Sequence, residues 1–197
     1  MAAKLEFISP SWNDIFDMCV EGAERIDKLG IKFDIIIALS RGGLVPGRLI
    51  SDLLEIRDVI VLDVKYYFGI GIKIDKPRIT ELVRTSITSK NVLLVDDVVD
   101  SGESIKASAE YLSSLRPNVM KIFTLNVKPK RIINPDVFIK ETSAWIIYPW
   151  ELLECFKELE EKGYNINEIA EETGLKEEAL TKVKRLYEKR RREGQTK

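Results

Sequence analysis

The stretch VLLVDDVVDSGES, residues 92–104, decides the fold. It begins with four apolar residues, continues with the carboxylates Asp96 and Asp97, two valines and Asp100, and ends in a Ser-Gly-Glu-Ser turn. A short apolar run of this kind predicts a strand buried on both faces, which is typical of parallel sheets covered by helices. The carboxylates therefore fall at the carboxyl end of the strand, where open α/β sheets bind their ligands.

A helix is expected directly after this turn, because residues 105–115 carry apolar side chains at helical spacing. The stretch is thus a strand, a loop of small residues and the start of a helix. Backbone N–H groups and the positive end of the helix dipole make such a loop suitable for binding a phosphate.

The length and composition of the chain limit the classes of protein to which it can belong. The chain has 197 residues, of which 45% are hydrophobic and 32% charged, so we expect one main globular domain with a small appendage. Its apolar runs are shorter than the roughly 18 residues of a membrane span, and the first residues lack the apolar stretch of a signal peptide. We therefore expect a cytoplasmic protein without a membrane partner.

The chain contains no histidine, which excludes Ser-His-Asp and Cys-His catalysis and most zinc sites. Its chemistry must therefore use carboxylates, lysine, arginine, hydroxyls or the backbone. The net charge of −1 gives no overall attraction to nucleic acid. Cys19 and Cys155 lie far apart, each within an amphipathic pattern, so we expect buried thiols and no disulfide.

Other segments complete an α/β pattern. A first buried strand, 34–39, runs into the small polar loop Ser40-Arg41-Gly42-Gly43, as the strand at 92–99 runs into its own loop. Residues 65–77 have no clear period and predict a mobile loop, in the form of a β-ribbon, that folds over an anionic ligand. The remaining expected strands are 58–64, 79–87, 119–127, 135–139 and 144–148, and the remaining helices are 10–29 and 43–54.

The character of the chain changes after residue 150. Three amphipathic segments, 152–161, 166–173 and 176–192, predict a small three-helix unit in which Gly163 and Gly174 separate the helices. We therefore expect a main domain over 1–150 and a helical unit over 151–197.

Residues 92–104 resemble the phosphoribosyl-pyrophosphate (PRPP) binding motif of type I phosphoribosyltransferases at all thirteen positions. The resemblance extends over roughly residues 8–151. It implies the type I phosphoribosyltransferase fold, an α/β fold with a mostly parallel central sheet flanked by helices. It also implies a homo-oligomer, with a dimer favoured.

The residue types suit PRPP. Asp96 and Asp97 can accept hydrogen bonds from the two ribose hydroxyls, and Asp97 can also face the Mg²⁺ that PRPP itself mainly holds. The loop formed by Ser101, Gly102, Glu103 and Ser104 offers N–H groups and hydroxyls to the 5′-phosphate. By the resemblance to the purine branch of the family, Asp100 is the catalytic general base.

The remaining predicted contacts come from other loops. The resemblance assigns Ser40, Arg41 and Gly42 to the pyrophosphate, in a loop that in relatives often contains a non-proline cis peptide. Residues 127–129 and 145–151 resemble the base-binding parts of xanthine-guanine phosphoribosyltransferases. Carried over, Lys128 donates a hydrogen bond to the base, Trp145 stacks on it, and the Ile146 carbonyl reads its edge.

The resemblance implies purine salvage: a purine base and PRPP give a purine nucleoside 5′-monophosphate and pyrophosphate. The sequence does not decide which purine is the substrate. A lysine donor favours a 6-oxopurine, whereas the added C-terminal helices keep adenine as an alternative. A second class of function is also an alternative: a PRPP-sensing regulator that binds nucleic acid. The reason is that residues 166–192 faintly resemble a helix-turn-helix. Repulsion between Glu177-Glu178 and phosphates argues against nucleic acid as a partner.

Overall fold

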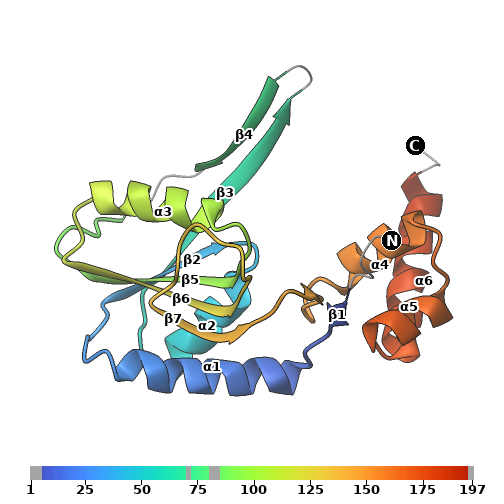
Figure 1. The fold of residues 1–197 in the computed structure, drawn as a ribbon, viewed down its shortest axis with the longest axis horizontal. Coiled ribbons are helices and arrows are strands. Elements are labelled where there is room, and N and C mark those ends of the chain that lie inside the picture. Colours follow the sequence, from blue (N-terminus) through green and yellow to red (C-terminus); the bar gives the residue numbers. More distant parts are fainter. Residues whose placement is uncertain (1–5, 70–71, 80–84, 195–197) are drawn as a thin grey trace. The chain divides into compact units, whose positions relative to one another are not determined.

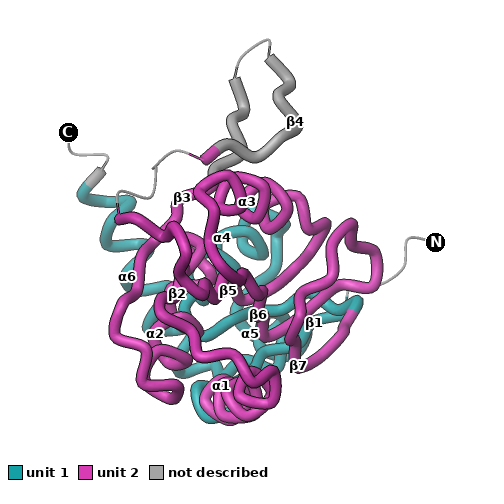
Figure 2. Tube along the Cα trace, turned by 90° about the vertical axis from the view of Figure 1, so that its left-hand side faces the viewer, with its two compact units in different colours: residues 1–14, 143–197 teal, residues 15–142 magenta. Residues whose placement is uncertain are grey.

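The computed structural model describes residues 6–69, 72–79 and 85–194. The chain forms two compact units, a larger one over residues 15–142 and a smaller one over residues 1–14 and 143–197 (Figure 2). This division by compactness differs from the domain boundary that the sequence predicts at residue 150, which stays a prediction.

The larger unit is built on a six-stranded sheet with the order β4-β3-β2-β5-β6-β7. All neighbouring strands are parallel except β3 and β4, which form an antiparallel pair. The mostly parallel α/β sheet predicted from the buried apolar runs is therefore confirmed. The strands are β2 (Ile35–Ser40), β3 (Val59–Gly69), β4 (Ile72–Ile79), β5 (Asn91–Val99), β6 (Val119–Val127) and β7 (Val137–Glu141).

Helices cover both faces of this sheet (Figure 1). On one face lie α1 (Trp12–Asp27) and α2 (Leu44–Leu53), and on the other lies α3 (Glu103–Ser114). Packing on the first face is so close that a Cβ on Gly47 of α2 would lie 2.9 Å from the Cβ of Ala38. On the second face, Ile105 and Leu112 of α3 join alternate strand residues in one buried cluster.

The central strands have apolar residues on both faces because helices cover both. Ile35, Ile37, Val92 and Leu94 belong to the cluster beneath α3. Their neighbours along the strands point to the opposite face and are buried as well. This double burial explains why the runs at 35–39 and 92–95 are continuously apolar instead of alternating.

The segment between β3 and β5 is a β-ribbon, as predicted for residues 65–77. Lys65 of β3 pairs with Arg78 of β4, and Gly69 pairs with Ile72. The strand predicted at 79–87 is wrong for its described part, because β4 ends at Ile79 and residues 85–87 are not strand. The ribbon already supplies the returning strand before residue 80, and residues 80–84 lie outside the described residues.

The smaller unit contains three helices and a two-stranded parallel sheet. The helices are α4 (Leu152–Glu161), α5 (Ile166–Thr173) and α6 (Glu177–Gly194), close to the predicted bounds. The sheet pairs β1 (Phe7–Ile8) with β8 (Trp145–Ile146), so the strand predicted at 144–148 is shorter than expected. Phe156, Leu159, Ile169 and Leu180 are buried in a core that belongs to this unit alone.

Both cysteines are buried and free. Burial raises the pKa of Cys19 to about 12 and that of Cys155 to about 11, so both are neutral thiols at physiological pH. None of the helices in the described ranges is long and apolar enough to cross a membrane.

Candidate active site

Two loops meet at the carboxyl edge of the sheet. Strands β2 and β5 are parallel neighbours, so the loop at 40–43 and the end of β5 emerge at the same edge. A Cβ built on Gly42 would overlap both carboxylate oxygens of Asp97. The side chain of Asp97 is therefore fixed against the first loop, and the residue is only 5% exposed.

The loop after β2 is closely packed at its glycines. The N–H of Gly43 donates to the carbonyl of Leu39 at 2.9 Å, and a Cβ at Gly43 would overlap the carbonyl oxygen of Val95. The Ser40–Arg41 peptide is cis, as the resemblance implies, and Arg41 is exposed. The loop thus presents a guanidinium and close-packed backbone at the end of the sheet, a combination suited to a diphosphate.

The loop after β5 ends at the start of α3. Gly102 is the N-cap residue, with a φ of 88° that favours glycine, and it has no side chain to cap the first N–H groups of the helix. The Oγ of Ser101 accepts from the N–H of Glu103 at 3.4 Å. Beside this loop is a cavity of about 290 Å³ lined by residues 96, 98–102, 104 and 105. Its size and its N–H donors suit a phosphate.

The adjacent carboxylates face different sides of β5. Successive strand residues point to opposite faces, and accordingly Asp97 lies against Gly42 whereas Asp96 lines the cavity beside α3. The Oδ1 of Asp96 accepts from the N–H of Asp97 at 3.0 Å, which fixes its orientation. Asp100, one turn of the loop further on, is exposed. The three carboxylates thus follow one another at the end of β5 without forming one cluster among the described residues.

A third loop, residues 128–134, is attached to the second by two backbone hydrogen bonds. The N–H of Lys128 donates to the Val99 carbonyl at 2.8 Å, and the N–H of Ile132 donates to the Ser101 carbonyl at 2.9 Å. Partial burial lowers the pKa of Lys128, while the charge of Asp100 acts in the opposite direction. Lys128 and Asp100 are therefore electrostatic neighbours at this edge.

Arg131, which no sequence motif predicts, holds this third loop together. Its Nη1 donates to the carbonyl of Lys128 at 2.7 Å and to Oε2 of Glu141 at 2.6 Å. Its Nε donates to Oδ1 of Asn134 at 2.7 Å, and the guanidinium lies 5.5 Å from the ring centre of Phe138. With a side chain only 12% exposed, Arg131 is a structural anchor. No local sequence feature distinguishes it from Lys130 beside it.

Trp145 and Ile146 belong to the smaller unit, so the structure brings the other predicted site residues together without them. Trp145 pairs with Phe7 in the short parallel sheet, and its N–H donates to the Glu6 carbonyl at 2.7 Å. The residue is 47% exposed, which is unusual for a tryptophan placed only for packing. Ile146 is buried. Within this unit Trp145 is thus available for stacking.

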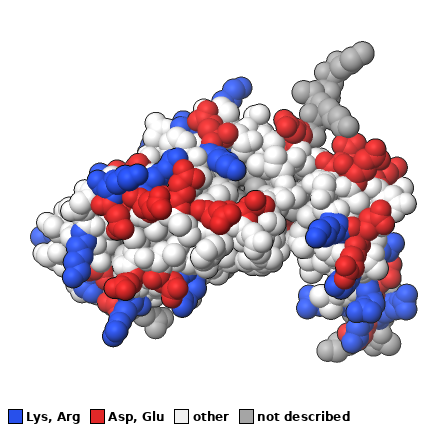
Figure 3. Space-filling model, turned by 90° about the horizontal axis from the view of Figure 1, so that it is seen from below, with Lys and Arg blue, Asp and Glu red and all other residues white. Residues whose placement is uncertain are grey.

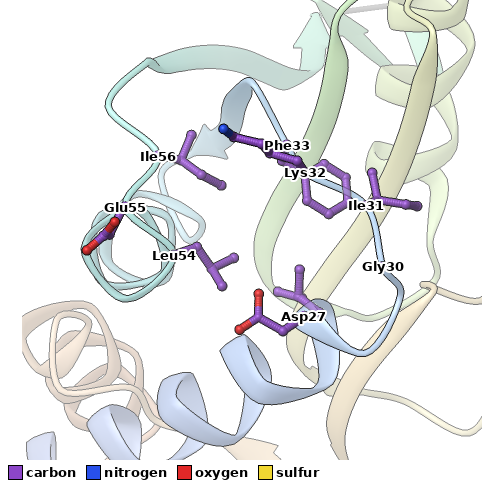
Figure 4. A pocket seen from close by; sticks show the side chains of 9 residues that line it. Asp27, Gly30, Ile31, Lys32, Phe33, Leu54, Glu55 and Ile56 are labelled. Carbon is purple, nitrogen blue, oxygen red and sulfur yellow. The ribbon is translucent and has the colours of Figure 1, made fainter.

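A larger cavity, of about 430 Å³, lies at the opposite edge of the same sheet (Figure 4). Its walls come from the ends of α1 and α2 and from the segments that lead into β2 and β3. Asp27, Lys32 and Glu55 are its charged residues. Because ligands of parallel sheets bind at the carboxyl edge, we assign the functional site to the three loops and not to this cavity.

Comparison with known proteins supports this assignment. A family model described as the phosphoribosyl transferase domain matches residues 11–153. A xanthine-guanine phosphoribosyltransferase of Ruegeria sp. (strain TM1040) is 31% identical over 152 residues, covering 72% of this chain and 84% of that protein. Another, from Idiomarina loihiensis, is 33% identical over 144 residues, covering 72% of this chain and 85% of that protein.

Solved structures of similar proteins support the same assignment. A purine phosphoribosyltransferase from Pyrococcus horikoshii Ot3 is 31% identical, with a TM-score of 0.67, and the match covers 74% of this chain and 94% of that one. A protein from Neisseria gonorrhoeae, solved with bound ppGpp, is 26% identical, with a TM-score of 0.68 and coverage of 81% and 98%. The family model matches well over half of the chain, including every loop of the site. The chain therefore belongs to the phosphoribosyltransferase family.

Proposed function

We propose that this protein transfers the 5-phosphoribosyl group of PRPP to a 6-oxopurine base, giving a purine nucleoside 5′-monophosphate and pyrophosphate. The observation that carries the proposal is the packing of Gly42 against Asp97, with the loop at 101–104 beside it. One strand end thus provides carboxylates for a diol between two loops suited to phosphates. The names of the relatives, xanthine-guanine and purine phosphoribosyltransferases, support the purine as acceptor.

In this proposal each part of PRPP has its own partner. The N–H groups of Ser101–Ser104 and the dipole of α3 hold the 5′-phosphate. Asp96 and Asp97 accept hydrogen bonds from the ribose hydroxyls. Ser40, Arg41 and Gly42 hold the pyrophosphate through the guanidinium and the backbone. The sugar is thereby fixed in line between the base and its leaving group.

The reaction breaks the bond from the anomeric carbon to pyrophosphate and forms a bond from that carbon to a ring nitrogen of the base. Positive charge develops on the ribose while negative charge grows on the pyrophosphate, where Arg41 stabilises it. Asp100 accepts the proton that the base loses. Its electrostatic neighbour Lys128 supports a base site at this position. No covalent nucleophile is needed, which suits a chain without histidine.

Magnesium fits this site as a partner of the substrate. In proteins Mg²⁺ is commonly held by one or two carboxylates together with substrate phosphates. Asp97, packed against the pyrophosphate loop, is a suitable carboxylate, and within the described ranges there is no cluster of three acidic, histidine or cysteine side chains to form a separate site. Bound there with PRPP, Mg²⁺ would neutralise charge on the pyrophosphate.

Lys128 favours a 6-oxopurine over adenine. Its ammonium is a hydrogen-bond donor, so it complements the exocyclic oxygen of guanine, hypoxanthine or xanthine, whereas the amino group of adenine is itself a donor. Trp145 stacking on the base and Ile146 reading its edge complete the proposal. Three further points stay predictions: the dimer, the cytoplasmic location and the alternative of a PRPP-sensing regulator.

Pyrophosphate release from PRPP and Mg²⁺ with a panel of bases tests the function. We expect turnover with guanine, hypoxanthine or xanthine at a kcat/KM at least about 100-fold above that for adenine, because a hydrogen-bonding site rejects the mismatched donor. Lys128→Met, which keeps the length of the side chain without its charge, should reduce the ratio of kcat/KM for the 6-oxopurine to kcat/KM for adenine. Preference for adenine would refute the base assignment, and no turnover with any purine would refute the transferase.

Gly42→Ala tests the contact between the first two loops. The added Cβ overlaps the Asp97 carboxylate, so kcat/KM for PRPP should fall on the order of 100-fold, and the overpacking should lower the unfolding temperature by several degrees. Asp97→Asn and the double variant Gly42→Ala/Asp97→Asn complete a double-mutant cycle. Because the two residues are in contact, the double variant should be hardly worse than the poorer single variant. If the fold-losses in kcat/KM of the two single variants multiply in the double variant, the two residues act independently.

Arg131→Met tests the anchor of the third loop. Loss of its hydrogen bond to the Lys128 carbonyl should raise the KM for the base about tenfold, which is about 1.4 kcal/mol. The KM for PRPP should change less than about twofold, and Arg131→Lys should restore part of the loss. An equal rise in both KM values would mean that Arg131 only supports the fold.

A further inference from the structure

The smaller unit carries three helices for which the transferase mechanism has no use. The family model ends at residue 153, so α5 and α6 lie outside it entirely. Their apolar residues Ile169 and Leu180 are 0% and 1% exposed and pack with Cys155, Phe156 and Leu159 of α4. An independent core of this kind indicates a module with its own role.

The connection between α5 and α6 is a short, fixed turn. Only three residues separate Thr173 from Glu177, and Gly174 among them has a φ of 70°, which favours glycine. The N–H of Gly174 donates to the Ala170 carbonyl at 2.9 Å, and the Oγ1 of Thr173 accepts from the N–H of Leu175 at 3.2 Å. Two helices joined by a three-residue turn with a glycine have the form of a helix-turn-helix.

The first helix of this pair is fixed at its other end as well. The side chain of Asn165 accepts from the N–H of Glu168 at 3.1 Å, and the carboxylate of Glu168 accepts from the N–H of Asn165 at 2.7 Å. This capping box defines where α5 begins. The pair is therefore a rigid support that presents one face of α6.

That face of α6 is basic. Leu180, Val183 and Tyr187 face the core, and the exposed residues on the other side follow helical spacing: Glu178, Thr181, Lys182, Arg185, Lys189 and Arg192. Residues 182–192 contain seven cations and one carboxylate. Figure 3 shows Lys and Arg side chains, in blue, gathered at its lower right and interspersed with Asp and Glu, in red.

The two glutamates at the start of α6 do not oppose a polyanion as strongly as the sequence suggests. The Nζ of Lys182 donates to Oε1 of Glu178 at 2.5 Å, so this exposed carboxylate has a cation beside it. A glutamate on a recognition helix also accepts a hydrogen bond from the amino group of cytosine in the major groove. Repulsion at Glu178 is thus reduced.

We propose that α6 is the recognition helix of a module that binds double-stranded DNA. Glu178, Thr181, Lys182 and Arg185 have the i, i+3, i+4, i+7 spacing by which a recognition helix reaches base edges. Lys189 and Arg192 continue the same face toward the C-terminus, where they contact phosphates. This binding uses residues outside the transferase site and does not depend on the proposed reaction.

Fluorescence anisotropy with the full chain and a labelled random-sequence duplex of about 30 base pairs tests the proposal. Non-specific binding should appear in the micromolar range at about 50 mM salt and weaken linearly in log Kd against log salt. Arg185→Glu/Lys189→Glu should weaken binding at least about tenfold and reduce the salt slope by about two. Its transferase kinetics should equal those of the unchanged chain, which shows that the variant is folded.

Lys28→Glu/Lys162→Glu is the matched control, because it changes the net charge equally at exposed lysines that do not belong to α6. It should retain the DNA affinity within about threefold. The proposal is overturned if the control loses as much affinity as the α6 variant. It is also overturned if the duplex does not bind at tens of micromolar, or if single-stranded RNA of the same length binds more tightly.

Discussion

Gly42 lies so close to the Asp97 carboxylate that a side chain at this position has no room, and the other loops of the site are arranged around this contact. It joins the loop after β2 to the end of β5, the two neighbouring strands at the centre of the sheet. A parallel sheet brings both loops to one edge, but only glycine lets the backbone touch the carboxylate. The predicted pyrophosphate loop and the predicted ribose carboxylates are thereby held at a fixed distance.

Backbone hydrogen bonds extend this arrangement to the third loop. The N–H groups of Lys128 and Ile132 donate to the carbonyls of Val99 and Ser101, so two hydrogen bonds join residues 99–102 to residues 128–132. Arg131, hydrogen-bonded to the carbonyl of Lys128, fixes the segment that presents the ammonium. The chain thus places carboxylates, a guanidinium, an ammonium and backbone N–H groups at one strand end without histidine, and these are the groups that a diphosphate, a diol and an oxopurine need.

Much of the fold was predictable because buried parallel strands are continuously apolar, as in 35–39 and 92–95. The three C-terminal helices were predictable from their apolar spacing and from Gly174. Other features depend on the fold and not on local sequence. The weak alternation at 79–87 gave a wrong strand, because the ribbon had already returned at β4. Arg131 could not be found, since its partners Glu141 and Phe138 meet it only in the folded chain.

The central claim is that the end of β5 binds PRPP, and calorimetric titration of PRPP with Mg²⁺ tests it most directly. The unchanged chain should bind one PRPP per chain. Asp96→Asn/Asp97→Asn, which keeps the shape and removes the charges, should weaken binding by at least about 100-fold, because charged hydrogen bonds to the diol are lost. Binding of PRPP with unaltered affinity by this variant would contradict the assignment of the site.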